Sequence, residues 1–179
     1  MKFHRTVGVM GQTSESLKWP LPNDLTVAYF RSPTEFWFGT RTGMVRVKDG
    51  QTRAFGEADG LQSESVRDFV DGPDKRMWAA TGHGVAEWDE RKWTYPGEQD
   101  QLRGKTSGMV KDKFGWVWVG TTSGLFLCGA PDPNTDEKFS IIKLDSKRGL
   151  ADDHIVDVAL DKYSRVWVLS EKGVSILER

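Results

Sequence analysis

Cysteine is nearly absent from this chain of 179 residues, in which Cys128 is the one copy. An internal disulfide is therefore excluded, and the fold does not depend on an oxidising compartment. No apolar run approaches the roughly 18 residues that a membrane-spanning helix needs. The N-terminal segment lacks the continuous apolar stretch of a signal peptide. As written, the sequence is that expected of a soluble cytoplasmic protein, and a segment of a periplasmic or extracellular receptor would look the same.

A net charge of one sign is also missing, because 25 Lys and Arg residues balance 26 Asp and Glu residues. Such a chain has no broad attraction to nucleic acid or to an anionic membrane. Histidines are few, and the group Asp152, Asp153 and His154 offers metal-binding side chains at a spacing that equally suits a turn. No nucleophile–base pattern occurs. We therefore expect no catalytic residue, no metal and no cofactor.

Tryptophan is plentiful instead, and four of the eight copies recur in one phrase. The phrase reads EFWFGTRTG (35–43), RMWAATGHG (76–84), GWVWVGTTSG (115–124) and RVWVLSEKG (165–173). Its tryptophans are 41, 40 and 49 residues apart, and each is followed by a hydroxyl at the third position, a glycine at the sixth and an apolar side chain at the seventh. This column consists of Trp37, Trp78, Trp118 and Trp167. A fixed period of this kind indicates a repeat protein in which the tryptophans pack between units.

Each repeat predicts four short antiparallel strands. Around Trp118 the residues alternate yet stay apolar on both faces, as in a strand that is buried on both sides. The T-x-x-G that follows is typical of a hairpin in which glycine adopts a positive φ. Four strands in about 40 residues is the pattern of a propeller blade. We therefore predict a single all-β domain over residues 1–179, a β-propeller of four-stranded antiparallel blades. Trp19, Trp88 and Trp93 lie outside the column, and we expect them to be partly exposed.

The two ends of the chain predict how the last blade is completed. The fourth repeat stops at GVSILER (173–179), after its third strand, while KFHRT (2–6) resembles KFSII (138–142). We expect residues 2–6 to supply the outer strand of the last blade, which would cover two exposed sheet edges. The wider spacing before Trp167 is explained by CGAPDPNTDEK (128–138), which we interpret as an exposed loop insertion.

The segments GLQSESVRDFVDGPDKRMWAATGHGV and GLADDHIVDVALDKYSRVWVLSEKGV resemble the two-component regulator propeller repeat. The resemblance covers most of residues 20–179. Gly60-Leu61 and Gly149-Leu150 keep the opening pair of that repeat, whereas WPLPNDL (19–25) and DQLRGKT (100–106) depart from it. The family implies a β-propeller that serves as a ligand-sensing extracellular part of a bacterial signalling receptor. It supplies no catalytic residues.

Receptors of that family carry more repeats, a membrane span and signalling domains. Four blades form a tight ring if they close alone. Two chains could instead join as a homodimer into one larger ring, or the sequence could be a segment of a longer chain.

A ligand site is expected at the mouth of the propeller, where the loops before the inner strands meet the hairpins between the middle strands. The side chains there differ in every repeat, whereas the tryptophans recur. We predict the following ligand-binding residues: Asp24, Arg41, Glu64, His83, Lys105, Ser123, Asp153, His154 and Lys172. Asp68 and Asp157 share a column of the inner strands and could line the channel as solvated acids.

Three functions fit these patterns. The first is a non-catalytic module that binds a small molecule or a protein. The second is a propeller lyase of the streptogramin-lyase type, for which His83, His154 and Glu64 would have to converge. The third is a structural half-ring that assembles into a larger propeller or complex.

Overall fold

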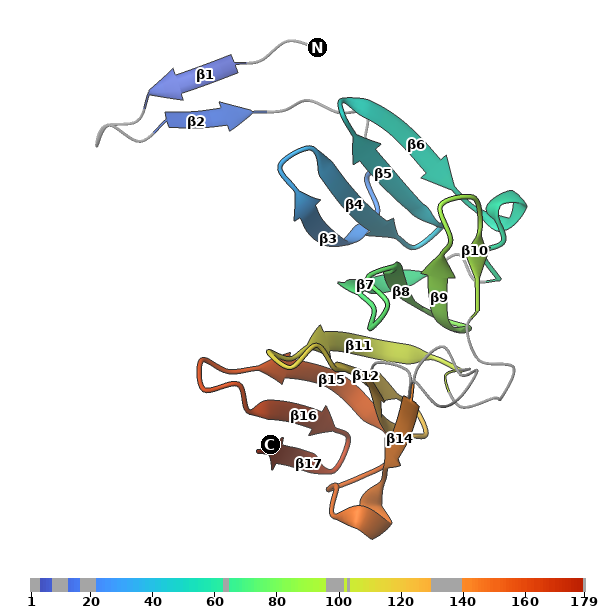
Figure 1. The fold of residues 1–179 in the computed structure, drawn as a ribbon, viewed down its shortest axis with the longest axis vertical. Helices are drawn as coiled ribbons and strands as arrows, with labels where there is room; N and C mark the ends of the chain where they lie inside the picture. Colours follow the sequence, from blue (N-terminus) through green and yellow to red (C-terminus); the bar gives the residue numbers. More distant parts are fainter. Residues whose placement is uncertain are drawn as a thin grey trace.

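The computed structural model describes residues 22–62, 65–95, 102, 104–129 and 140–178, together with the backbone of 4–7 and 13–16. Four antiparallel sheets follow one another along the chain in the order of the sequence repeats, and we call them blades 1 to 4 (Figure 1). The strands of the first two are β3 (Leu25–Ser32), β4 (Glu35–Thr40), β5 (Met44–Lys48) and β6 (Gln51–Phe55) in blade 1, and β7 (Val66–Asp71), β8 (Met77–Thr81), β9 (Gly84–Trp88) and β10 (Trp93–Thr94) in blade 2.

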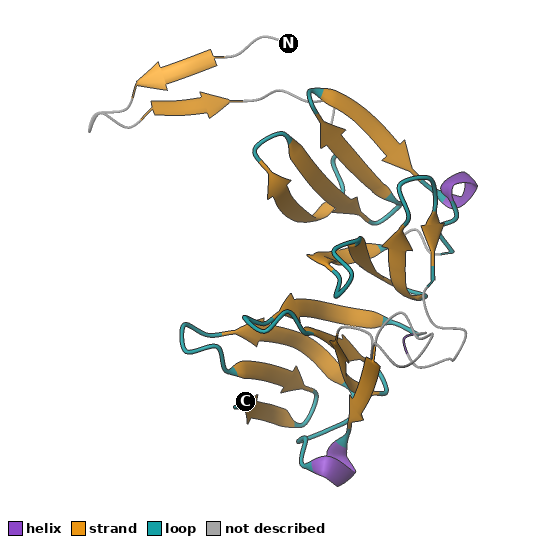
Figure 2. Cartoon of the chain, in the orientation of Figure 1, coloured by secondary structure: helices purple, strands orange, loops and turns teal. Residues whose placement is uncertain are grey.

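Blades 3 and 4 continue the same pattern. Their strands are β11 (Thr106–Lys111), β12 (Val117–Thr121), β13 (Gly124–Gly129) and β14 (Ser140–Leu144) in blade 3, and β15 (Ile155–Leu160), β16 (Val166–Ser170) and β17 (Gly173–Leu177) in blade 4. Two short 3-10 helices, Glu57–Asp59 and Ser146–Arg148, lie outside the sheets (Figure 2). The predicted all-β propeller with four repeats is confirmed, with four strands in blades 1 to 3 and three described strands in blade 4.

The hydroxyl and the glycine of the repeat together stabilise the hairpin between the second and third strands. In each blade the hydroxyl donates to the carbonyl of the glycine three residues later and so closes the hairpin. The bonds are Thr40–Gly43 (3.0 Å), Thr81–Gly84 (2.7 Å), Thr121–Gly124 (2.9 Å) and Ser170–Gly173 (2.8 Å). The four glycines have φ between 136° and 156°, which a side chain rarely adopts.

Replacing Thr121 by valine should lower the free energy of unfolding by about 1–2 kcal/mol, because a buried hydroxyl that bonds Gly124 is lost at nearly constant shape. The exposed neighbour Thr122 is the control, and its valine variant should change stability by less than about 0.5 kcal/mol. Urea denaturation of the two variants measures the difference. Equal losses of stability in the two variants would contradict the role of the Thr121 hydroxyl in closing the hairpin.

Each tryptophan of the column donates its indole Nε1–H to a carboxylate of its own blade. The pairs are Trp37–Glu35 (3.0 Å), Trp78–Glu87 (3.3 Å), Trp118–Asp112 (3.1 Å) and Trp167–Asp161 (3.1 Å). Asp112 and Asp161 hold the same place in the repeat, before the second strand. Blades 1 and 2 carry other residues there and provide the acceptor from Glu35 and Glu87. The indole can therefore be buried without leaving its donor unpaired.

Among the described residues, the core has three layers between adjacent blades and a smaller cluster of Phe38, Val45 and Val47 on the other face of blade 1. Trp37 packs against blade 2 together with Phe69 and Trp88, and Trp78 packs against blade 3 together with Val119. Trp118 packs against blade 4 together with Val168. The expected packing of the column between blades is therefore confirmed for the first three blades.

The expected exposure of Trp88 and Trp93 is wrong, since each is only 1% exposed. Both belong to an aromatic cluster between blades 1 and 2, in which the Trp88 ring lies 4.9 Å from Phe55 and 5.5 Å from Trp93. The short outer strand β10 brings Trp93 over this layer. Trp19 lies outside the described residues.

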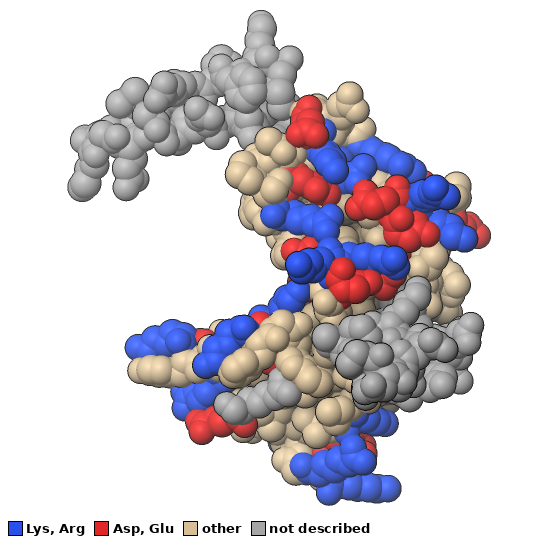
Figure 3. All heavy atoms as spheres, viewed as in Figure 1, with Lys and Arg blue, Asp and Glu red and all other residues tan. Residues whose placement is uncertain are grey.

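The four blades form an open arc. The inner strands of adjacent blades are neighbours, β3 with β7, β7 with β11, and β11 with β15, and blades 1 and 4 lie at opposite ends of the arc (Figure 1). In the space-filling view the concave side of this arc is open, and acidic and basic side chains are interspersed over blades 1 and 2 (Figure 3).

The N-terminal strand differs from the expectation for residues 2–6. The strand β1 (His4–Val7) pairs with β2 (Thr13–Ser16), and the sheet of blade 4 is described as β15-β16-β17. Pairing with a segment so near in sequence closes a short loop, which costs less chain entropy than reaching the far end of the arc. Closure of blade 4 by residues 2–6 stays a prediction for an assembled ring.

The predicted loop insertion begins later than expected. Cys128 and Gly129 still belong to β13, where Cys128 pairs with Ile141 of β14. Cys128 is an apolar, buried side chain of the layer between blades 2 and 3, which explains why the strand continues through it. Residues 130–139 lie outside the described part of the chain.

Candidate functional site

The mouth of the propeller is built by one backbone contact repeated in blades 2 to 4. The loop before the inner strand accepts a hydrogen bond from the hairpin between the second and third strands. These bonds are Gly82 N–H to the Ser65 carbonyl (3.2 Å), Thr122 N–H to Lys105 (3.3 Å) and Glu171 N–H to His154 (3.2 Å). In blade 1 the side chain of Asp24 makes the link, because its Oδ2 accepts from Arg41 N–H (3.1 Å) and Thr42 Oγ1 (3.2 Å). The structure thus brings each loop to its hairpin at one end of the blade.

Blade 4 places two pairs of ionisable side chains at this end. His154 Nδ1 lies 3.3 Å from Glu171 Oε1, and Lys172 Nζ lies 3.1 Å from Asp152 Oδ1. Asp153 is engaged elsewhere, since its Oδ1 accepts from Ser146 N–H at 2.6 Å, and this bond lowers the pKa of the Asp153 carboxyl. Asp152, Asp153 and His154 therefore make separate contacts. Among the residues that the structure describes, no group of three His, Cys, Asp or Glu side chains is arranged to hold a metal ion.

Blades 2 and 3 contribute mostly short polar and aromatic contacts. The ring of His83 packs edge-on against Tyr95, with 5.5 Å between the ring centres, and its carbonyl accepts from Gly104 N–H at 3.1 Å. The hydroxyls of Ser123 and Thr121 are 3.2 Å apart. Lys105 has an exposed side chain, and Glu64 lies outside the described residues. The His83 carbonyl thus ties the hairpin of blade 2 to the loop of blade 3.

The sequence suggests that Asp68 is a solvated acid in the channel, but the structure shows its carboxylate bonded to backbone N–H groups. Its Oδ1 accepts from Phe69 N–H (2.8 Å), and its Oδ2 accepts from Met109 N–H (2.7 Å) on the inner strand of the next blade. Asp157 makes the first of these bonds, to Val158 N–H (2.8 Å), and its carboxylate occupies the space that a Cβ atom at Gly108 of blade 3 would need. Asp68 is therefore a link between blades 2 and 3.

The stability that depends on Asp68 should fall as the pH rises. Burial raises the pKa of the Asp68 carboxyl, an effect that its hydrogen bonds from Met109 and Phe69 oppose. A carboxyl with a raised pKa binds its proton more tightly in the folded state, so the folded state loses relative stability as the pH rises through that pKa. The free energy of unfolding of the wild type minus that of Asp68→Asn should decrease from about pH 4 upward. Urea denaturation of both proteins at several pH values measures this difference in unfolding free energy. A difference that grows with pH would contradict the raised pKa of the Asp68 carboxyl.

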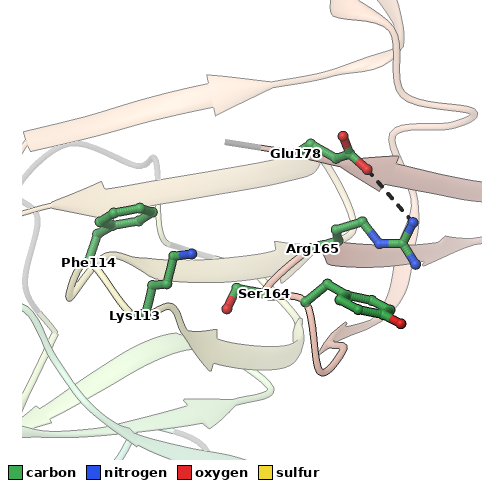
Figure 4. A pocket seen from close by; sticks show the side chains of 6 residues that line it. Lys113, Phe114, Ser164, Arg165 and Glu178 are labelled. Atoms are coloured by element: carbon green, nitrogen blue, oxygen red, sulfur yellow. Dashed lines mark ion pairs between the residues drawn. The ribbon is translucent and has the colours of Figure 1, made fainter.

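A second concave feature lies at the opposite end of the strands, where the inner strands of blades 3 and 4 turn into their second strands. This pocket has a volume of about 300 Å³ and is lined by Lys113, Phe114, Tyr163, Ser164, Arg165 and Glu178 (Figure 4). Phe114 and Tyr163 are 60% and 66% exposed, and Arg165 reaches Glu178 at 3.7 Å. The pocket combines exposed aromatic rings with cationic side chains and is open to solvent.

Sequence reasoning missed this pocket, although a signal for it exists. The turns DKFG (112–115) and DKYS (161–164) place an aromatic residue at the same position of two successive repeats. In each turn the first aspartate accepts from backbone N–H groups through its Oδ1, those of Phe114 and Trp116 in one and those of Tyr163 and Arg165 in the other. The aromatic ring is thus held at the tip, in solvent.

Cys128 offers no reactive nucleophile. It is buried in the layer between blades 2 and 3, and burial raises the pKa of its thiol to about 12. The thiol stays protonated at neutral pH, and the thiolate is the reactive form.

Comparisons with known proteins give a fold and no close relative by sequence. No protein-family model matches the chain, and no curated protein matches it. Among solved structures, the extracellular domain assigned to the hybrid two-component system BT3049 of B. thetaiotaomicron is 16% identical, with a TM-score of 0.68 over 97% of this chain and 28% of that one. The chain thus spans about a quarter of the length of that domain.

Two further structures have the same arrangement of strands. Virginiamycin B lyase from Staphylococcus aureus is 12% identical, with a TM-score of 0.59 over 98% of this chain and 62% of that one. The WD40 β-propeller domain of Doa1 is 12% identical, with a TM-score of 0.57 over 87% and 51% of the two chains. No helix in the described residues is long and apolar enough to cross a membrane. This chain has a β-propeller fold, and its structural neighbours include the extracellular domain of a two-component system, in agreement with the resemblance seen in its repeats.

Proposed function

We propose that this chain is a non-catalytic binding module, part of a propeller that receives a ligand or a protein at its mouth as a sensor does. The observation that carries the proposal is that the polar groups within the blades have a structural role, whereas those at the mouth vary. The hydroxyls of the repeat and the carboxylates beside its tryptophans are used in bonds within each blade. The mouth side chains differ from blade to blade on this constant frame, which is where recognition can vary without loss of the fold.

The structural neighbours support the same function. The BT3049 neighbour is by its name the extracellular domain of a hybrid two-component system. We extend this to the present chain as a sensor role outside the cytoplasm. The likeness at 16% identity concerns the fold, so the ligand has to be found by experiment.

A thermal-shift screen with a defined library of small metabolites tests the proposal. A ligand that binds only the folded state at 100 times its Kd stabilises it by about 2.7 kcal/mol, which gives a clear rise in Tm. The rise should be lost in Arg41→Ala and Lys172→Ala, two exposed mouth residues, and kept in Phe114→Ser at the opposite pocket. A rise lost only in Phe114→Ser would move the site to the pocket. Chemical conversion of the bound compound would overturn a non-catalytic role.

The lyase alternative has one observation in its favour. His154 and Glu171 lie within 3.3 Å of each other at the mouth, a pair that can hold and move a proton, and a streptogramin-type lyase is among the structural neighbours. Incubation with a streptogramin B and Mg²⁺, followed by chromatography, separates the two functions. Chemical conversion of the streptogramin by the wild type, and no conversion by the His154→Ala variant, would favour the lyase. An unchanged substrate favours the binding module.

A further inference from the structure

The hairpin between β5 and β6 of blade 1 forms a hollow that is separate from the mouth and from the pocket at Phe114. Its volume is about 410 Å³, and its lining consists of Arg46, Lys48, Asp49, Gln51, Thr52 and Arg53. Small-molecule sites have volumes of about 300–1,000 Å³. Because β6 is the outermost strand of blade 1 (Figure 1), the hollow lies at the rim, at the end of β5 that is opposite to the mouth.

Two arginines stand directly opposite each other in this hairpin. Arg46 of β5 pairs with Arg53 of β6. Like charges in opposite positions of an antiparallel pair are destabilising. The corresponding pairs of blades 2 and 3 contain no arginine and are Glu87 with Thr94 and Leu127 with Ile142. The repeat therefore does not require these cations, and their cost to blade 1 needs a compensating role.

Arg46 is mostly covered, yet within the described residues its guanidinium donates no hydrogen bond. Its side chain is 16% exposed, and its Nη1 lies 4.0 Å from a carboxylate oxygen of Glu35 and 4.0 Å from one of Glu90, beyond hydrogen-bond distance. A guanidinium has five N–H donors, and buried polar groups in proteins are nearly always bonded. The donors of Arg46 are thus available to a molecule in the hollow.

Aromatic rings hold both guanidinium groups in place. The Cζ atom of Arg46 lies 5.3 Å from the ring centre of Trp37, and that of Arg53 lies 4.5 Å from the ring centre of Phe55. Both are also within cation–π range of Trp88, at 5.9 Å and 5.5 Å. A side chain that is already fixed loses less conformational freedom when it binds an anion.

The carboxylates around the hollow leave its positive charge in excess. The lining has three cations and one carboxylate, that of Asp49. Glu35 accepts from the Trp37 indole at 3.0 Å and lies 3.9 Å from Lys48 Nζ. Asp59 bonds Arg53 at 2.8 Å. Glu35 is thus shared between several donors, and the hollow favours a ligand with more than one negative charge.

We propose that the hollow binds a small molecule that carries a phosphate monoester. The planar forks of two arginines match the oxygens of a phosphate group, and lysine adds a third cation. A phosphate monoester carries a charge of about −1.5 to −2 at neutral pH, which suits three cations better than a single negative charge does. The inference does not depend on what the mouth binds.

Three probes that share one phenyl ring test the charge of the ligand. They are phenyl phosphate, phenyl sulfate and benzoate, titrated into the protein by calorimetry in about 0.15 M NaCl, where distant charges are screened. Phenyl phosphate should bind at one site and at least fivefold more tightly than the other two, because it alone carries about two charges. Equal affinity for all three would overturn the proposal. So would the absence of saturable binding at about 10 mM phenyl phosphate, well above a millimolar Kd.

Two substitutions of exposed cations locate the site. Arg53→Gln and Lys48→Gln change side chains that are 48% and 46% exposed, and each should weaken phenyl phosphate by about five- to tenfold. Arg91→Gln is the matched control, because it removes the same charge from the corresponding hairpin of blade 2. It should change the affinity by less than about twofold. Equal weakening by all three variants would indicate general charge attraction in place of a site.

Removal of the carboxylate from the lining should have the opposite effect. Asp49→Asn is expected to tighten phenyl phosphate by about two- to fivefold, because a like charge beside the anion is lost. Asp49 has a φ of 49°, a conformation that asparagine also adopts, so the hairpin is kept. Circular dichroism checks that each variant is folded. An unchanged or lower affinity of folded Asp49→Asn would contradict binding in this hollow.

Discussion

Replacing Trp37 by alanine is expected to lower the free energy of unfolding by about 3–5 kcal/mol, the range for a large side chain removed from a core. Trp37 is fully buried and stacks on Phe55 with 5.5 Å between ring centres. Trp93 lies edge-on at the same distance. The substitution also removes the indole donor of Glu35, a residue that is 7% exposed. A large cavity and a buried carboxylate with one donor fewer would both remain between blades 1 and 2.

The matched control for Trp37 is another tryptophan of the same column. Trp167 makes the same kind of bond, to Asp161, but it is 38% exposed, because none of the described residues packs over that face of blade 4. Trp167→Ala should therefore cost no more than about 1.5 kcal/mol in a single chain at low concentration. Urea denaturation of both variants measures the two losses. Equal losses at low concentration would mean that the outer face of blade 4 is covered within one chain.

Replacing Arg76 by methionine is expected to cost about 2–4 kcal/mol, because it leaves a carboxylate without its cation in the core. Glu87 is completely buried, and its Oε1 lies 2.5 Å from Arg76 Nη1 while its Oε2 accepts from Trp78 at 3.3 Å. Arg76 itself is 45% exposed, so solvent screening keeps the loss below that of a wholly buried pair. The same pairing raises the pKa of the Arg76 guanidinium.

A double-mutant cycle gives the Arg76 prediction its control. If the loss comes from the stranded charge, then adding Glu87→Gln to Arg76→Met should recover part of the stability, because a neutral amide needs no cation. Glu87→Gln alone still accepts from Trp78 and should cost less than Arg76→Met. Losses that simply add in the double variant would show that Arg76 acts through packing of its side chain.

The repeat explains why the blades could be predicted in detail from the sequence. Trp118, Thr121 and Gly124 stand at fixed spacings because one hairpin geometry is used four times, and a spacing of that kind is visible in a single chain. The mouth could be placed in the same way, because the loops follow from the strand order. Whether the mouth residues bind a ligand stays a prediction.

Features that depend on one blade alone could not be predicted from the repeat. Trp88 and Trp93 lie outside the column, and their burial follows from an aromatic cluster that occurs at one junction. The hydrogen bond that Asp68 accepts from Met109 of the next blade depends on how closely two inner strands approach, and the sequence does not show this distance. The N-terminal pairing of β1 with β2 is local, and nothing in the similarity of residues 2–6 to 138–142 indicates it.

The strand order has a consequence for how the chain reaches this fold. Each described strand of a blade pairs with the strand next to it in the sequence, so the strand pairing within a blade is local. The apolar faces of a blade are buried only when a neighbour packs on them, so adjacent blades stabilise one another. Stability then grows roughly as a sum of blades and junctions, as in a linear array. Gain or loss of one repeat by duplication or deletion would change the length of the arc and leave each remaining junction as it was.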